Sequence, residues 1–113
     1  MKKDPLVFIG HMLECIDLIQ QYTKNKTEDD FLDSSLLQDA VVKRIEIIGE
    51  AAKNLPDSFK VMWLEVPWKK ITGMRDKLVH EYVGIDFELA WVVVQDDLPT
   101  LKKQLQEIKN KSV

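Results

Sequence analysis

Apolar residues repeat every three to four positions along most of the chain, which is the spacing of one face of an α-helix. Such segments run from about Pro5 to Tyr22, from about Glu28 to Asn54, from Pro67 to about Tyr82, and onward from Asp86. The stripes that predict these four helices are Leu6, Ile9, Leu13 and Ile16; Leu37, Val41, Ile45, Ile48 and Ala52; Trp68, Ile71, Met74, Leu78 and Val79; and Val94, Leu98, Leu101, Leu105 and Ile108. No segment alternates in the way that predicts a β-strand.

Residues with capping preferences mark the expected helix ends. Asp33 or Ser34 is expected to kink or cap the early part of the second helix. Asn54, which tolerates a left-handed cap and precedes Leu55 and Pro56, is expected to end that helix. Gly84 is expected to end the third helix, and Asp86 to cap the fourth.

Two residues inside the predicted helices call for a structural reason. Gly49 lies within the second helix, where glycine costs about 1 kcal/mol relative to alanine, so we expect two helix backbones to approach closely there. Pro99 is expected to bend the last helix. With short connections between the helices, the pattern predicts an all-α antiparallel bundle of four to five helices in a single domain, residues 1–113.

Composition narrows the class of protein. The 113 residues are 45% hydrophobic and 31% charged, as in a globular domain, and the formal net charge is -3. A non-specific duplex binder is normally basic, so any RNA binding has to use a local basic site. The one cysteine, Cys15, allows no internal disulfide and favours a reducing, cytoplasmic location. No run reaches the roughly 18 apolar residues of a membrane span, and the N-terminal segment meets His11 and Glu14 too early for a signal peptide.

Ionisable residues crowd into the end of the third predicted helix, namely Arg75, Asp76, Lys77, His80, Glu81 and Tyr82. On a continuous helix, Arg75 and Tyr82 share a face, Asp76 can touch His80, and His80 stands about 140° around from Arg75. One helix therefore does not aim Arg75 and His80 at one small target. Two copies related by a two-fold axis can place both residue types in a shared cleft.

These residue types suit RNA cleavage without a metal ion. Histidine, which titrates near neutral pH, can remove the 2′-hydroxyl proton, and arginine can stabilise negative charge on the phosphate. Asp76 can orient His80, and Lys69, Lys70 and Lys77 can supply positive potential for contact with RNA. The same residues also fit a solvated helix end with weak ion pairs, and the residues alone favour that interpretation.

Three stretches carry a family resemblance. The segment from Trp68 to Tyr82, with the following Gly84-Ile85-Asp86, resembles the HepT-like toxins of the HEPN superfamily. The run from Ile47 to Lys53 resembles the same family's second helix, and Trp91 and Leu98-Pro99 also fit.

The resemblance implies a homodimeric, HEPN-like helical ribonuclease that needs no metal and no cofactor. In such proteins the motif arginine and histidine, here Arg75 and His80, line a cleft at the dimer interface. The polar residue after the arginine, often asparagine, is here Asp76. A partner nucleotidyltransferase, acting as antitoxin, attaches AMP to the position matching Tyr82 and silences the toxin. The resemblance also places Glu50 towards the cleft. A non-catalytic helical adaptor for a nucleotidyltransferase, and a structural homodimer with a degenerate site, are the alternatives.

Other candidate sites are weaker. His11, Glu14 and Cys15 share helical spacing, but two histidines and one cysteine make a closed zinc site improbable, and Cys15 is expected in the core. Trp63, Trp68 and Trp91 are expected in the core or an interface rather than stacked on bases. The seam from Val94 to Ile108 fits either internal packing or a partner helix.

Overall fold

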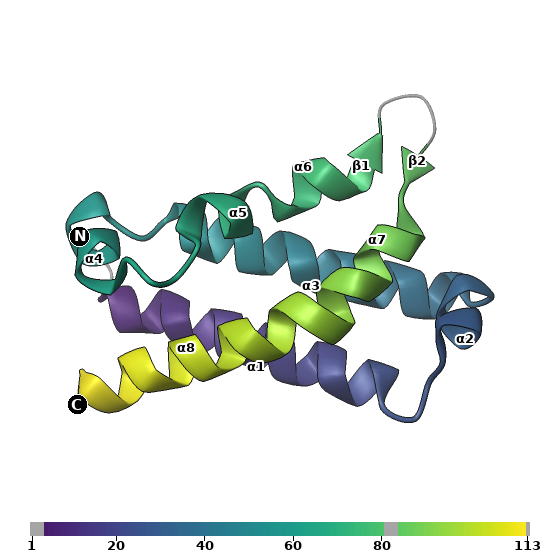
Figure 1. Cartoon of the computed structure of the whole chain (residues 1–113), viewed down its shortest axis with the longest axis horizontal. Helices are drawn as coiled ribbons and strands as arrows, with labels where there is room; N and C mark the ends of the chain where they lie inside the picture. The colour runs from purple at the N-terminus through teal and green to yellow at the C-terminus, as the bar shows by residue number, and fades with distance from the viewer. Residues whose placement is uncertain (1–3, 81–83, 113) are drawn as a thin grey trace.

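Three long helices form the frame of the molecule. They are Pro5–Thr23 (α1), Ser35–Lys53 (α3) and Leu98–Lys111 (α8). α1 runs antiparallel to α3 and packs against both α3 and α8 (Figure 1). The computed structural model describes residues 4–80 and 84–112.

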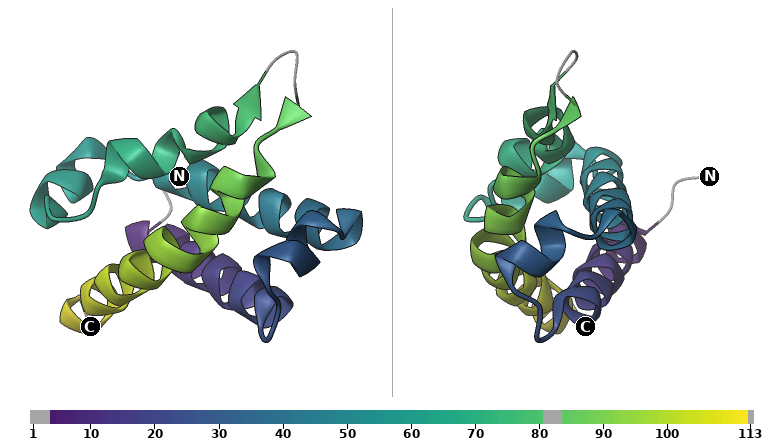
Figure 2. Two further views of the ribbon diagram at one scale, coloured as in Figure 1. Left: turned by 45° about the vertical axis from the view of Figure 1, so that its right-hand side comes forward. Right: turned by 90° about the vertical axis from the view of Figure 1, so that its right-hand side faces the viewer.

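Shorter elements connect these helices and cover them. α5 and α6 lie along α3, and α2 packs against α7, which leads towards α8 (Figures 1 and 2). The bounds are Glu28–Leu32 (α2), Asp57–Lys60 (α4), Val61–Trp63 (η1, a 3₁₀ turn), Trp68–Thr72 (α5), Met74–Leu78 (α6), Val79–His80 (β1), Gly84–Ile85 (β2), Phe87–Val92 (α7) and Val93–Asp97 (η2, a π-helical turn).

The predicted apolar stripes form one buried core. Ile9, Ile16, Ile45, Leu98 and Leu105 are fully buried. The remaining buried members of the stripes are Leu13, Val41, Ile48, Ala52, Trp68, Ile71, Met74, Leu78, Val94, Leu101 and Ile108. The prediction of an all-α helical bundle is therefore confirmed, because each helix turns its stripe towards the others.

Side-chain caps explain where several helices begin. The Ser34 hydroxyl accepts a hydrogen bond from the Leu37 backbone N–H at 3.1 Å, and this divides the predicted second helix into α2 and α3. Asp86 caps α7 as predicted, accepting from the Leu89 N–H at 3.0 Å. Asn54 ends α3 at the expected position, but its backbone is right-handed (φ -80°). The prediction of a left-handed cap at Asn54 was therefore wrong. The Asn54 side-chain amide instead donates to the Glu50 carbonyl at 2.9 Å.

The predicted continuous helix from Trp68 to Tyr82 is wrong. α5 ends at Thr72 and α6 begins after Gly73, whose φ of -90° and ψ of 2° depart from helical values. α6 then stops at Leu78, and the chain becomes extended at Val79, a β-branched residue with strand preference. The pattern of apolar spacing does not register this change, because Leu78 and Val79 fit a helical stripe and a short strand equally well.

A two-stranded antiparallel ladder replaces the end of that predicted helix. Val79 pairs with Ile85 and His80 with Gly84, and the Asp86 N–H donates to the Leu78 carbonyl at 2.7 Å. Gly84 was expected to end a helix, and that prediction was wrong. It lies in β2 with a positive φ of 87°, which glycine adopts without strain. β1 and β2 project from the bundle beyond the ends of α6 and α7 (Figures 1 and 2).

The expected close approach at Gly49 is confirmed, and a wider turn of helix precedes Pro99, where a bend was expected. A Cβ atom on Gly49 would lie 3.4 Å from the Ile71 carbonyl oxygen and 3.7 Å from that of Thr72, so the backbones of α3 and α5 do approach closely. Near Pro99 the helix widens into the η2 π turn immediately before α8. Proline lacks an N–H and its ring clashes with the carbonyl four residues earlier, and a wider turn relieves both problems.

None of the helices within residues 4–80 and 84–112 has the length and apolar character needed to span a membrane.

Candidate active site

Arg75 lies on α6, where this short helix runs beside α3. Its Nε atom is 3.5 Å from the Glu46 Oε1 on α3, and its Nη1 atom is 3.7 Å from the Oδ1 of neighbouring Asp76. The Arg75 side chain remains 53% exposed. Arginine is thus held at the surface by two carboxylates while it stays accessible to a solute.

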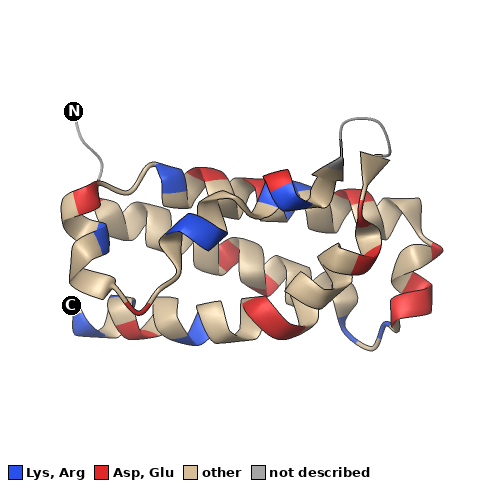
Figure 3. Cartoon of the chain, turned by 45° about the horizontal axis from the view of Figure 1, so that its top comes forward, with Lys and Arg blue, Asp and Glu red and all other residues tan. Residues whose placement is uncertain are grey.

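A cleft of about 340 Å³ opens beside Arg75, between α3 and the α5–α6 segment. It is lined by Glu46, Gly49, Glu50, Lys53, Thr72, Arg75 and Asp76. Basic and acidic residues lie close together where α6 runs beside α3 (Figure 3). The cleft therefore carries mixed charge, with Arg75 and Lys53 as its cations and three carboxylates around them.

His80 is the second residue of β1, not part of the helix that carries Arg75. Three helical steps and two extended ones separate the two residues by roughly 11 Å along the chain, compared with about 7.5 Å for five helical steps. The premise that Arg75 and His80 stand 140° apart on one continuous helix was wrong, because α6 ends at Leu78. A site shared by two chains stays a prediction. The backbone of His80 is instead fixed by its pairing with Gly84.

Asp76 pairs with Arg75, and the helical spacing that was to bring it beside His80 is absent. That argument required both residues on adjacent turns of one helix, and α6 ends between them. Orientation of His80 by Asp76 stays a prediction. Asp76 is 81% exposed and pairs with Arg75 through Nη1. The structure thus connects Asp76 with the arginine of the motif.

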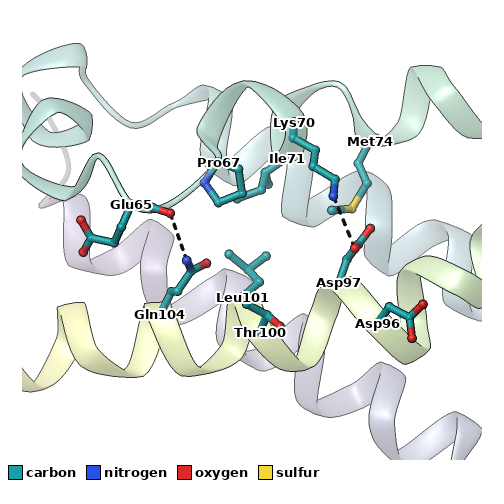
Figure 4. A pocket seen from close by; sticks show the side chains of 10 residues that line it. All are labelled: Glu65, Pro67, Lys70, Ile71, Met74, Asp96, Asp97, Thr100, Leu101 and Gln104. Carbon is teal, nitrogen blue, oxygen red and sulfur yellow. Dashed lines mark hydrogen bonds and ion pairs between the residues drawn. The ribbon is translucent and has the colours of Figure 1, made fainter.

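The three lysines expected to contact RNA lie outside the cleft beside Arg75. Lys70 pairs with Asp97 at 3.4 Å across a different cleft, of about 250 Å³, between α5 and the η2–α8 segment. Figure 4 shows these two side chains facing each other there, with Gln104 donating to the Glu65 carbonyl at 3.0 Å nearby. Lys69 and Lys77 are exposed, and none of the three lines the Arg75 cleft. RNA contact by these lysines stays a prediction.

Tyr82, the expected modification site, and Glu81 lie outside the described residues. The argument that Tyr82 shares a helical face with Arg75 was wrong, because α6 ends at Leu78. Tyr82 falls in the segment that joins β1 to β2, two residues after His80.

Sequence reasoning missed Glu46 and Lys53 as neighbours of Arg75. Together with Glu50, which lines the same cleft, they form a polar stripe on α3 at intervals of four and three residues. The position of Glu50 at a dimer interface stays a prediction. That stripe borders Gly49, where the backbones of α3 and α5 approach closely. A polar helical stripe next to a glycine was therefore a usable signal in the sequence.

The other candidates behave as core residues or surface residues. Cys15 is 3% exposed, and burial raises the pKa of its thiol, while His11 and Glu14 on the same helix are exposed. Trp68 is buried, and Trp91 packs on Phe31 with ring centroids 5.5 Å apart. The prediction that the tryptophans serve packing is confirmed for these two, and Trp63 also packs against the core.

Comparisons with known proteins agree on one family. Residues 12–108 match the family model described as ribonuclease HepT-like. A Thermococcus cleftensis protein described as a probable ribonuclease HepT is 38% identical over 109 residues, which cover 96% of this chain and 99% of that protein. A Caldanaerobacter subterraneus protein described as a putative RNase is 40% identical over 109 residues, or 96% of this chain and 97% of that protein.

A longer relative contains the same region beside another one. A Methanocaldococcus jannaschii protein described as a gamma-glutamylcyclotransferase and putative RNase is 52% identical over 108 residues. The match covers 96% of this chain but only 49% of that protein, so the chain spans about half of this relative's length. No solved structure gives a significant match. From its family model and from relatives that it matches almost end to end, the chain belongs to the HepT-like ribonuclease family.

Proposed function

We propose that this chain is a metal-independent endoribonuclease and the toxin of a toxin–antitoxin pair, with Arg75 and His80 of two copies at a dimer cleft. The observation that carries the proposal is Arg75 itself, a half-exposed arginine held over a cleft within a family of ribonucleases. A guanidinium presents several N–H donors in one plane, which suits the oxygens of a phosphodiester.

The proposed reaction needs only side chains and the RNA. The imidazole of His80 removes the proton of a 2′-hydroxyl, whose oxygen forms a new bond to the adjacent phosphorus. The bond from phosphorus to the 5′ oxygen breaks, and that oxygen takes a proton from a second imidazolium. Arg75 stabilises the charge that builds on the phosphate oxygens during attack. The products are a 2′,3′-cyclic phosphate and a 5′-hydroxyl.

A two-fold dimer supplies the second imidazolium and a second arginine. Each copy carries Arg75 and His80 in one continuous segment, α6–β1, so an isologous contact there doubles both residue types in one cleft. Mixed dimers of Arg75→Ala and His80→Ala chains test this arrangement. In a shared cleft they keep one arginine and one histidine, with water replacing the second imidazolium as the acid, so we expect them to cleave faster than the mean of the two variants. Cleavage by mixed dimers at or below that mean, as independent sites would give, would contradict a shared site.

Tyr82 is the proposed point of regulation. AMP attached there by a partner nucleotidyltransferase adds a bulky anion two residues from His80, which opposes RNA binding by size and by charge. Incubation with the partner and ATP should add one AMP to the wild type and none to Tyr82→Phe, read by intact mass. AMP addition to the Phe variant would place the modification elsewhere.

Growth on expression of the chain alone tests the toxin proposal. We expect arrest with the wild type and with His11→Ala, which removes the chain's other histidine from an exposed site on α1, but growth with His80→Ala. The second candidate function, a non-catalytic adaptor for a nucleotidyltransferase, is favoured by the two carboxylates that neutralise Arg75. It predicts no arrest by any of the three chains.

A further inference from the structure

The two carboxylates on Arg75 differ in how firmly they are held. Glu46 sits in the middle of the 19-residue α3, next to fully buried Ile45, and its side chain is 35% exposed. Asp76 sits on the five-residue α6, and its side chain is 81% exposed. A carboxylate on a long packed helix keeps its position, whereas an exposed one changes rotamer at little cost.

They also contact different parts of the guanidinium. Glu46 lies 3.5 Å from Nε, which is the guanidinium nitrogen nearest the aliphatic part of the side chain. Asp76 lies 3.7 Å from Nη1, at the outer end of the guanidinium. Contact at Nε fixes how the planar group is turned. Contact at Nη1 occupies a donor that an incoming phosphate would use.

We infer that Glu46 is a positioning residue that holds Arg75 over the cleft, and that Asp76 is a displaceable carboxylate that occupies Arg75 until a phosphate of the RNA replaces it. This inference rests on the proposed function, because it assumes that Arg75 meets a phosphodiester. The two roles explain why carboxylates surround the arginine in this cleft. Glu46 orients Arg75, and Asp76 screens its charge, so weakly binding anions compete poorly for Arg75.

The two roles predict opposite kinetic effects. An exposed ion pair is worth up to about 1 kcal/mol, so Asp76→Asn should tighten RNA binding by up to about five-fold and should change kcat less than Glu46→Gln does. Glu46→Gln also removes a negative charge and so should not weaken binding, but it replaces the ionic partner of Nε by a neutral amide and should lower kcat about ten-fold. Glu46→Asp, which keeps the charge, should recover part of that loss. Asp39→Asn, the same change of charge at an exposed position of α3, serves as the activity control.

Binding is measured by fluorescence anisotropy with a labelled single strand of mixed sequence that carries 2′-O-methyl sugars, which cannot undergo 2′-hydroxyl attack. Cleavage of the unmodified strand gives kcat and KM. Tighter binding with Asp76→Asn and a lower kcat with Glu46→Gln support the inference. If both variants only tighten binding equally and leave kcat alone, general charge explains both residues and the division of roles is overturned.

A spectroscopic measurement tests the positioning role without activity. The chain has two arginines, Arg44 and Arg75, so the Nε–H signals are few and Arg75→Lys identifies one of them. Glu46→Gln should move and broaden the Arg75 Nε–H signal. Glu50→Gln should leave it in place, because within the described residues Glu50 lines the cleft without an ion pair to Arg75. An unmoved Arg75 signal in Glu46→Gln overturns the inference.

Failure of the proposed function gives a different result. If Arg75→Ala binds and cleaves RNA like the wild type, Arg75 does not meet the phosphate and the proposed function falls. If Arg75→Ala loses binding while Asp76→Asn leaves the affinity for RNA unchanged, only the role of Asp76 is overturned.

Discussion

Alanine at Gly49 should stabilise the protein even though two helix backbones meet there. An added Cβ would lie 3.4 Å from the Ile71 carbonyl oxygen and 3.7 Å from that of Thr72, which are ordinary contact distances. Alanine is about 1 kcal/mol more favourable than glycine inside a helix. Since no clash offsets this gain, Gly49→Ala should raise the free energy of unfolding by about 1 kcal/mol.

A larger side chain at the same position should reverse the sign. The γ-carbons of valine extend beyond the Cβ position that already touches the α5 carbonyls. Overpacking of this kind costs about 1–3 kcal/mol, so Gly49→Val should be less stable than the wild type. Gly10→Ala on α1 is the control, because its Cβ would meet no heavy atom of the described chain within 4 Å and so gains only the helix preference.

Urea unfolding followed by circular dichroism measures all three variants. For a chain of this size, 1 kcal/mol corresponds to a shift of about 4 °C in Tm, which provides a second measurement. A loss of stability in Gly49→Ala beside a gain in Gly10→Ala would show that α3 and α5 approach more closely than described. Equal stability of Gly49→Ala and Gly49→Val would refute the close approach altogether.

Three further changes test the fold. Gly84→Ala should lose about 1–2 kcal/mol of unfolding free energy in urea, because φ is 87° there, and an unchanged value would argue against that conformation. Leu105→Ala, at a fully buried site, should lose about 2–5 kcal/mol, whereas Lys103→Ala on the exposed side of α8 should stay close to wild type. Hydrogen bonds from the Thr27 backbone N–H and hydroxyl hold the pKa of Asp30 below its usual 3.8. The ionised Asp30 therefore contributes its full stabilisation above pH 3.8, and this contribution is lost as pH falls through the lowered pKa. The difference in stability between wild type and Asp30→Ala should therefore shrink as pH falls through the lowered value, and a difference that does not change with pH would contradict the capping box.

The long helices were predictable because burial repeats along them without interruption. Ile9, Ile45 and Leu105 each lie in a stripe that every turn of helix renews, so the pattern averages over many residues. Ser34 and Asp86 were predictable for a separate reason, since a short polar side chain at a helix start satisfies a backbone N–H locally.

The segment from Gly73 to Ile85 was not predictable from periodicity. Its shape depends on pairing between Val79 and Ile85, which is a contact between two segments rather than a property of either. A two-residue strand is too short to show alternation. The signal that was available lies in composition, since the strand-forming residues Val79, Tyr82, Val83 and Ile85 gather around a glycine.

The residues of the candidate site could be proposed from the sequence, but their geometry could not be predicted. Arg75 and His80 followed from chemistry and resemblance, but the helical angle between them depended on a helix that ends at Leu78. Glu46 is 29 positions from Arg75 in the sequence and meets it only because α6 packs beside α3. No local pattern reports such a contact.

Cleavage of RNA in the presence of EDTA tests the central claim most directly. We expect the wild type and His11→Ala to cut an unmodified single strand and to leave 2′,3′-cyclic phosphate ends, identified by mass spectrometry. His80→Ala should be slower by a factor of about 10²–10⁴, the usual contribution of a general base. Equal cleavage by wild type and His80→Ala, or loss of all cleavage on addition of EDTA, would contradict the account.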